Sequence, residues 1–221
     1  MASILRRGHG LQVDHIGISV PDVELGIAEF ERLTGTRVAI DDPEPDQWYW
    51  SGVIPIAADS YVEVVGPNPE FSGQHPMLNL TLQLSGPTVF FWYIATDDIE
   101  GLATQAAAAG GAIEHIEWVN RDNAHPDAHQ YGRAILGPGF VPQRPCVIQW
   151  DRQIPRQATI GIEPECELTS LDLFHPTAAE SNAIMEKLGI DARIQPGASR
   201  LRLVLNTPNG EVILDNPGFD A

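Results

Sequence analysis

One short pattern occurs three times along the chain and limits the folds that are open to it. Each copy is an apolar, β-prone run, a residue that can cap a helix, a run of helical periodicity and a glycine. The three helices are predicted to end at Gly35, Gly110 and Gly189. Because β-prone runs also follow each helix, every copy is predicted to be a βαβββ module. The pattern therefore predicts an α+β fold made of repeated βαβββ modules.

The first copy, at residues 13–35, is the clearest of the three. Its strand alternates along the chain, so that His15 lies on the face turned away from Ile16 and Ile18. Asp22 then stands where its side chain can accept hydrogen bonds from the first turn of the helix. A histidine on the open face of this strand is the first candidate for chemistry.

The repeat also predicts how the chain is divided. Residues 11–151 are expected to form one domain of two modules, 11–67 and 86–151, and residues 165–217 a third, degenerate module. Leucines alternate between positions 78 and 84, which indicates a further strand between the first two modules. An odd module has no internal partner. We therefore expect the third to dock on the first two or on another subunit, which would form a homodimer.

Charge and composition exclude several classes of partner. The formal net charge is −17 over 221 residues, so the surface repels nucleic-acid phosphates and anionic lipid headgroups. No run reaches the roughly 18 apolar residues of a membrane span, and the first ten residues lack the apolar core of a signal peptide. Two cysteines in a chain of this length fit a reducing compartment. Together these features predict a cytoplasmic protein without a nucleic-acid or membrane role.

Four segments carry a resemblance to a known family. They are the opening run DHIGISVPD at 14–22, YVE at 61–63, the strand and helix at 91–110, and PCVIQWD at 145–151. With the repeat, they resemble the glyoxalase-like domain proteins of the vicinal-oxygen-chelate superfamily. The resemblance implies that each module bends its strands into a half-barrel with helices packed outside. It also implies that two modules enclose a cavity for a small-molecule ligand.

The resemblance further implies a divalent metal site. In this superfamily, residues on the first and last strands of the modules usually bind a metal, which chelates two oxygens of the substrate. On this chain the implied ligands from module one are His15 and Glu63, whose donors suit Zn, Ni, Mn or Fe. In module two the helix caps align Phe91 and Gln149 with these positions. The implied set is thus His15, Glu63 and Gln149, completed by water or a loop histidine.

Glu63 and His15 also have readings that need no metal. Glu63 could act as a general base, because burial beside aromatic rings makes a carboxylate more basic. A plain ion pair between His15 and Glu63 is the structural alternative.

The cavity wall has its own candidates, most of them aromatic. Each aromatic residue either belongs to the core or lines a flat apolar pocket. The arginine either binds a carboxylate in that pocket or forms a surface ion pair. These candidates are Trp48, Trp50, Tyr61, Phe91, Tyr93 and Arg133.

Two functions follow from the resemblance. The first is a metal-dependent enzyme that acts on a small oxygenated molecule by lyase, isomerase or dioxygenase chemistry. The second is a metal-free protein that binds or sequesters a small molecule, as proteins of the bleomycin-resistance type do. Phe91 favours the second function, because a phenyl ring cannot bind the metal.

Overall fold

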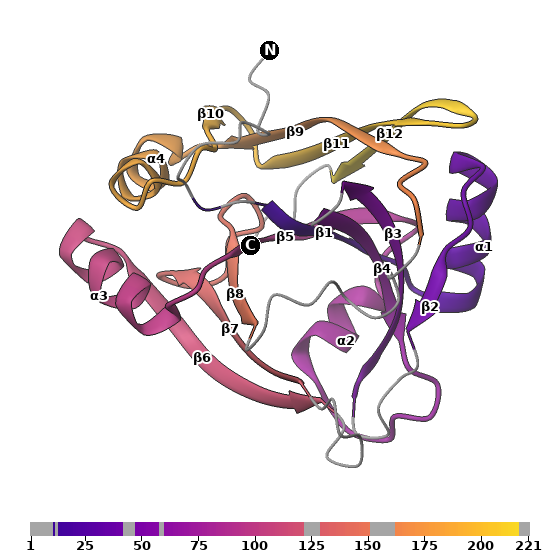
Figure 1. The fold of residues 1–221 in the computed structure, drawn as a ribbon, viewed down its shortest axis with the longest axis horizontal. Coiled ribbons are helices and arrows are strands. Elements are labelled where there is room, and N and C mark those ends of the chain that lie inside the picture. The colour runs from indigo at the N-terminus through magenta and orange to yellow at the C-terminus, as the bar shows by residue number, and fades with distance from the viewer. Residues whose placement is uncertain are drawn as a thin grey trace.

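The computed structural model describes residue 11 and residues 13–41, 47–57, 60–121, 129–150 and 162–216. Within these residues the strands form one sheet of eight strands and one of four. The smaller sheet lies across the middle of the larger one, and helices flank both (Figure 1). The predicted α+β class is confirmed. Among the described residues, no helix is long and apolar enough to span a bilayer.

The eight-stranded sheet consists of two halves with the same topology. In each half the first strand pairs in parallel with the last, and the other two strands extend the sheet antiparallel. The first half contains β1 (Val13–Ser19), β2 (Ala39–Asp41), β3 (Tyr49–Ala57) and β4 (Ser60–Pro67). The second half contains β5 (Thr88–Ala95), β6 (Ala112–Arg121), β7 (His129–Gly137) and β8 (Cys146–Trp150).

The two halves meet at β1 and β5, which pair antiparallel in the centre of the sheet. The strand order is therefore β2-β3-β4-β1-β5-β8-β7-β6. The first strand of each half thus lies beside the first strand of the other. This symmetry brings corresponding residues of the halves to the same region.

The helices α1 (Val23–Thr34) and α3 (Ile99–Ala109) begin and end as the repeat predicts. Asp22 caps α1 by accepting from the Leu25 N–H at 3.0 Å, and Asp98 caps α3 through the Gly101 N–H at 2.8 Å. Both helices end at a glycine in the left-handed region, with φ of 74° at Gly35 and 89° at Gly110. The sequence pattern therefore marks real helix ends.

The segment between the halves differs from the prediction. Its alternating leucines indicated a strand, but residues Pro76–Thr81 form the short helix α2. Pro76 occupies the first turn, and the His75 ring caps the helix by accepting from the Met77 N–H at 3.2 Å. These start signals outweigh the alternation of the leucines.

The third unit has the predicted elements but a different topology. Its elements are β9 (Glu167–His175), α4 (Ala178–Lys187), β10 (Ile194–Pro196), β11 (Arg200–Thr207) and β12 (Gly210–Asn216). Here the first strand pairs in parallel with the short β10 and antiparallel with β11, in the order β10-β9-β11-β12. The unit therefore repeats the order of elements along the chain but not the sheet of the two halves.

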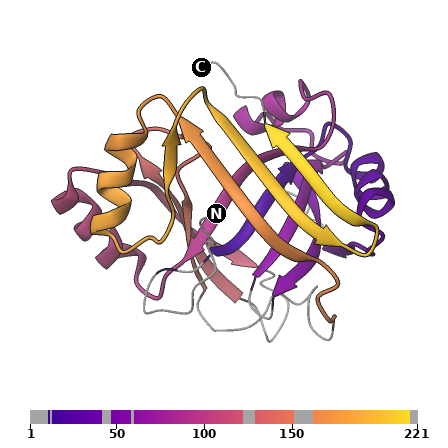
Figure 2. The same ribbon diagram turned by 90° about the horizontal axis from the view of Figure 1, so that it is seen from above.

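The four-stranded sheet packs on the larger sheet of the same chain (Figure 2). Ile16 and Trp92, from β1 and β5, share one hydrophobic cluster with Leu203 and Leu205 of β11. Each of these four side chains is at most 1% exposed. The third unit thus covers the back of the β1–β5 seam, as one of the two predicted ways of docking requires. A homodimer stays a prediction.

Candidate functional site

A cavity of about 260 Å³ lies on the other face of the eight-stranded sheet and is lined from both halves. His15, Tyr61 and Glu63 line it from the first half, and Phe91, Tyr93, Arg133, Cys146 and Trp150 from the second. His75 and Met77, at the start of α2, also belong to the wall. Side chains alternate along the central strands, which gives the sheet two different faces. Ile16 and Trp92 face the core, while His15 and Tyr93 face the cavity.

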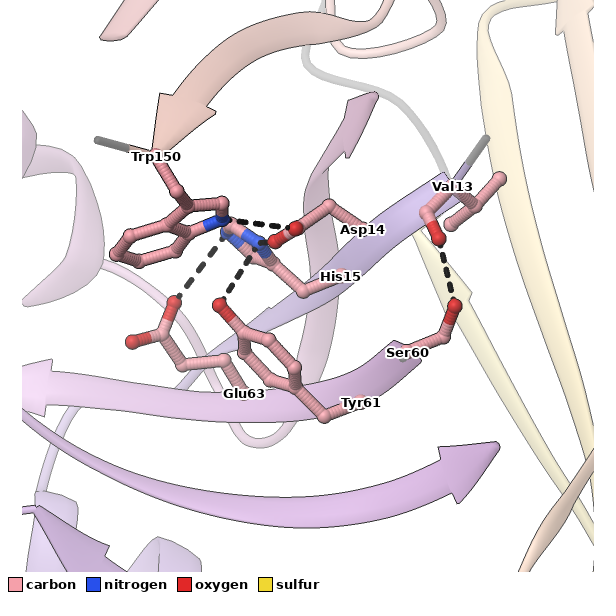
Figure 3. A network of polar contacts seen from close by, with 7 residues as sticks. All are labelled: Val13, Asp14, His15, Ser60, Tyr61, Glu63 and Trp150. Carbon is pink, nitrogen blue, oxygen red and sulfur yellow. Dashed lines mark hydrogen bonds and ion pairs between the residues drawn. The ribbon is translucent and has the colours of Figure 1, made fainter. Parts of the chain in front are cut away.

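Asp14, His15 and Glu63 form a row of acidic and basic side chains (Figure 3), and the last two of them line the cavity. The Nδ1 atom of His15 lies 2.5 Å from Oδ1 of Asp14. Its Nε2 atom lies 3.6 Å from Oε2 of Glu63 on the neighbouring strand β4. Asp14, His15 and Glu63 are 7%, 4% and 5% exposed. The histidine therefore has a carboxylate at each nitrogen, which gives either N–H an acceptor.

A local irregularity of β1 makes this row possible. Adjacent residues on a regular strand point to opposite faces, so Asp14 and His15 would not normally meet. The pairing of β1 with β5 shifts register between Val13 and His15, at the position of Asp14. Such a bulge changes the direction of a side chain, and here the Asp14 carboxylate reaches the His15 ring.

Two tyrosine rings fix the plane of the histidine. The ring of Tyr93 stacks on one side at 4.3 Å between centroids, and that of Tyr61 stacks at 4.9 Å. The Tyr61 hydroxyl also lies 3.1 Å from Nδ1 of His15. Burial raises the pKa of Tyr93 well above its ordinary value, so its hydroxyl stays protonated. The two tyrosines therefore hold the orientation of the imidazole.

Asp14 is held ionised by its neighbours. Burial alone would raise the pKa of this carboxyl, but the hydrogen bond and charge of His15 and the hydrogen bond of Trp150 outweigh it. The pKa of Asp14 consequently lies below its ordinary value. The indole N–H of Trp150 donates to Oδ2 of Asp14 at 3.0 Å, so the last strand of the second half supports the first strand of the first half.

The predicted wall residues are mostly in the cavity. Trp48, Tyr61, Phe91, Tyr93 and Arg133 line it. Trp50 does not: it packs against the hydrophobic core, and Tyr49 lines the cavity in its place. The reason is that β3 begins only at Tyr49, so alternation does not place Trp48 and Trp50 on one face.

Arg133 combines features of both of its predicted roles. It lines the cavity on β7, and its Nε atom donates to Oε2 of Glu117 on β6 at 2.8 Å. Its side chain is 32% exposed and that of Glu117 is 57% exposed. The pair is therefore partly exposed to solvent, unlike the buried row.

Gln149 is not placed as a ligand beside His15 and Glu63. Cys146, Ile148 and Trp150 line the cavity from β8, so Gln149 lies on the opposite face of this strand. Its Oε1 atom accepts from the Ile99 N–H at 2.7 Å, at the start of α3. Alignment on the helix caps gives the right correspondence for the first strands of the halves. It fails for the last strands, because the number of residues between cap and strand differs between the halves.

The strand register identifies the residue that corresponds to Glu63. Glu63 pairs with Gly17 on β1. Superposing the caps Asp22 and Asp98 puts Tyr93 at the position of Gly17, and Tyr93 pairs with Cys146 on β8. Cys146 therefore stands where the first half has Glu63. Burial raises the pKa of its thiol to about 12, so it does not offer a thiolate.

These residues do not fit the implied metal site. Phe91 has no donor, Cys146 holds its proton and Gln149 faces away, which leaves His15 and Glu63. In the part of the chain that the structure describes, no three His, Cys, Asp or Glu side chains gather as a metal ion would need. A catalytic zinc site uses three protein ligands. The loop histidine His125 lies outside the described residues.

Sequence reasoning missed two supports of the site. Asp14 is part of the opening motif, but a regular strand would turn it away from His15. Trp150 lies 136 positions further along the chain than Asp14, and no local pattern reports a contact over that distance. The density of aromatic residues on the central strands was the available signal for the cavity.

Comparison with known proteins agrees with this fold. The sequence pattern of the glyoxalase-like domain matches residues 13–189. A hypothetical protein from Staphylococcus aureus has a similar structure, with TM-score 0.60 and 10% identity over 93% of this chain and 85% of that one. A 4-hydroxymandelate synthase variant from Streptomyces coelicolor has TM-score 0.55 and 14% identity over 93% and 62%. These likenesses show the fold alone.

A smaller protein of known structure matches only part of the chain. Methylmalonyl-CoA epimerase from Streptomyces coelicolor has TM-score 0.47 and 15% identity over 66% of this chain and 99% of that one. Comparison with the curated proteins finds no matching sequence.

The match of the glyoxalase-like domain pattern to residues 13–189 spans well over half of the 221 residues. The chain therefore belongs to the glyoxalase-like domain family.

Proposed function

We propose that the chain binds a small molecule with adjacent oxygen atoms in its cavity and moves a proton on it, with Glu63 as base. The observation that carries this proposal is the row of Asp14, His15 and Glu63, of which His15 and Glu63 line the cavity. Neighbouring carboxylate and imidazole groups at the bottom of an apolar cavity are equipped for general acid–base catalysis. Membership of the glyoxalase-like family supports a substrate with adjacent oxygens.

The proposed chemistry uses only residues of the row. Glu63 removes a proton from a carbon next to a carbonyl group, and negative charge develops on the carbonyl oxygen. The Nε2 atom of His15, 3.6 Å from Glu63, carries a proton to that oxygen while Asp14 balances the charge of the ring. Glu63 then delivers the proton to the neighbouring carbon, and His15 recovers a proton from the hydroxyl group on the first carbon. The result is an isomerisation without net oxidation.

The cavity limits the size of the substrate. A volume of about 260 Å³ is near the lower end of ligand pockets, which start at roughly 300 Å³. An apolar cavity of roughly 150 Å³ holds benzene. A single ring with a short oxygenated side chain therefore fits, and the aromatic walls favour a flat molecule.

Proton exchange with solvent tests the proposal directly. The protein, dialysed against a chelator, is incubated in D₂O with 2-hydroxyacetophenone and with hydroxyacetone, and NMR follows loss of the α-proton. Glu63→Gln should reduce exchange about 100-fold or more, because general bases contribute roughly 10²–10⁴. Glu211→Gln, on the far sheet, is the matched control and should exchange like wild type. Equal exchange by wild type and Glu63→Gln would contradict the assignment.

The second candidate is a binding protein without catalysis. It is favoured by the cavity wall, which contains seven Trp, Tyr or Phe side chains and has Phe91 where the first half has His15. The same probes distinguish the two functions. Ligand-observed NMR that detects saturable binding, with no exchange above buffer, would favour the binding protein.

A further inference from the structure

We infer that the ring of Phe91 fills the position from which the second half would have to supply a metal ligand, so that this chain works without a metal beside His15 and Glu63. The inference concerns the same cavity as the proposed function, but it does not depend on which reaction occurs there. It rests on strand register, on the place of one ring and on the hydrogen bonds of His15.

The register shows which donors the second half would have to supply. Superposing the helix caps Asp22 and Asp98 puts Phe91 at the position of His15, and the β5–β8 pairing puts Cys146 at that of Glu63. One half therefore presents an imidazole and a carboxylate. The other presents a phenyl ring and a thiol that burial keeps protonated. The first half therefore has two side chains that can bind a metal, and the second half has none at the corresponding positions.

The Phe91 ring lies directly over the strand between the two donors. On β1, Gly17 pairs with Glu63 on one side and with Phe91 on the other. A Cβ atom built on Gly17 would lie 2.1 Å from the Cε2 and Cζ atoms of Phe91, so the ring rests on the bare backbone there. His15 is two residues away on the same face, with its ring 6.2 Å from that of Phe91 at 87°. The phenyl group thus fills the space in front of Gly17.

The donor atoms of the first half are already engaged with each other. Asp14 holds Nδ1 of His15 at 2.5 Å, and Glu63 faces Nε2 at 3.6 Å. Tyr93 and Tyr61 cover the two faces of the ring. Both nitrogens of His15 therefore already face carboxylate oxygens of the first half.

Cobalt titration of tag-free protein tests the inference, because Co²⁺ bound by nitrogen and oxygen donors absorbs visible light. Wild type should show no saturable absorption that depends on His15. Phe91→His adds a donor at the blocked position and should bind one Co²⁺ per chain, about 100-fold more tightly than wild type. Phe91→Leu is the matched control, since it removes the ring without adding a donor.

Two outcomes would overturn the inference. The first is stoichiometric Co²⁺ binding by wild type that His15→Ala abolishes, because the metal site would then exist with Phe91 in place. This arm needs no Phe91 variant and stands even if Phe91→His fails to fold. The second is equal affinity of Phe91→His and Phe91→Leu, which would show that position 91 does not face the site. Neither outcome depends on the proton-exchange assay. A negative result in that assay would therefore contradict the proposed function without contradicting this inference.

Discussion

The two halves of the eight-stranded sheet share a topology but differ in chemistry. In the first half the strands β1 and β4 present His15 and Glu63 to the cavity. In the second half β5 and β8 present Phe91 and Cys146 from corresponding positions. Both halves have the same strand pairing and the same Asp-capped helix with a terminal glycine. The backbone therefore preserves where side chains point and leaves their chemistry free to change.

The difference shows how an asymmetric site can arise on a symmetric frame. Polar groups of the first half sit on the floor, while the second half contributes aromatic rings that cover them, such as Tyr93 on His15. One connection reverses this division: the Trp150 indole of the second half supports the Asp14 carboxylate of the first. Each half thus completes the environment of the other.

The largest expected effect is on the reactivity of Cys146. In a Cys166→Ser background, Cys146 is the remaining thiol, and its pKa of about 12 leaves almost no thiolate at pH 8. Its reaction with a disulfide reagent should be roughly a thousandfold slower than that of an ordinary thiol. Absorbance of the released thiolate measures the rate, and denatured protein is the control. Fast labelling of native protein would show that Cys146 forms a thiolate. The second half would then also offer an ionised side chain to the cavity, against the contrast with the first half.

Next in size is the contribution of Asp14 to stability. Replacing Asp14 with Asn should lower the free energy of unfolding by about 3 kcal/mol at pH 7, because charged hydrogen bonds to His15 and Trp150 are lost. Denaturant titration measures the change. Asp191→Asn, at an exposed position, is the control and should stay within about 0.5 kcal/mol of wild type.

The Asp14 effect should depend on pH in a defined direction. The folded-state pKa of Asp14 lies below its ordinary value, so its ionised form stabilises the fold above the unfolded pKa of about 3.9. That stability is lost as the pH falls through the lower folded pKa. The difference between wild type and Asp14→Asn should therefore be full at neutral pH and shrink below about pH 4. A difference that stays constant down to acid unfolding would count against an ionised Asp14.

A close contact between the halves should give a smaller effect. Gly17→Ala places a methyl group against the Phe91 ring, which must move, at a cost of about 2 kcal/mol. In a Phe91→Leu background the same substitution should cost less, because the ring is absent. Thermal or denaturant unfolding of the four proteins in a double-mutant cycle measures the coupling. Additive effects would show that the ring does not rest on Gly17.

The smallest effect is expected at the bond between the halves. Trp150→Phe keeps an aromatic wall but loses the N–H donor to Asp14, which should cost about 1.5 kcal/mol. Trp118→Phe is the matched control at a position that is 40% exposed. If both variants unfold at the same denaturant concentration, the hydrogen bond from Trp150 to Asp14 does not stabilise the contact between the halves.

Local sequence signals predicted much of the fold. Helix caps such as Asp22 and Asp98 and terminal glycines such as Gly35 fixed the repeated units, because they depend only on neighbouring residues. The third unit keeps the glycine after its helix, Gly189 with φ of 71°, but its strands pair in another order. Strand order depends on packing between distant segments, so local signals could not reveal it.

The candidate site was predictable only in part. His15 and Glu63 were brought together as their alternation suggested, with Nε2 and Oε2 3.6 Å apart. Gln149 was not, since a shift of one residue along a strand turns a side chain to the other face. The bulge that brings Asp14 to His15 has no signature in a single sequence.

The Trp150–Asp14 hydrogen bond has a consequence for the order of events during synthesis. Its two residues are 136 positions apart, so Asp14 leaves the ribosome long before the indole that supports it. Until β8 has been added to the sheet, the Asp14–His15 pair lacks this support, and Tyr93 must also arrive to cover the ring. A nascent chain that carries only the first half therefore displays the histidine without the environment that orients it. Completion of the second half is the step that gives the histidine its final surroundings.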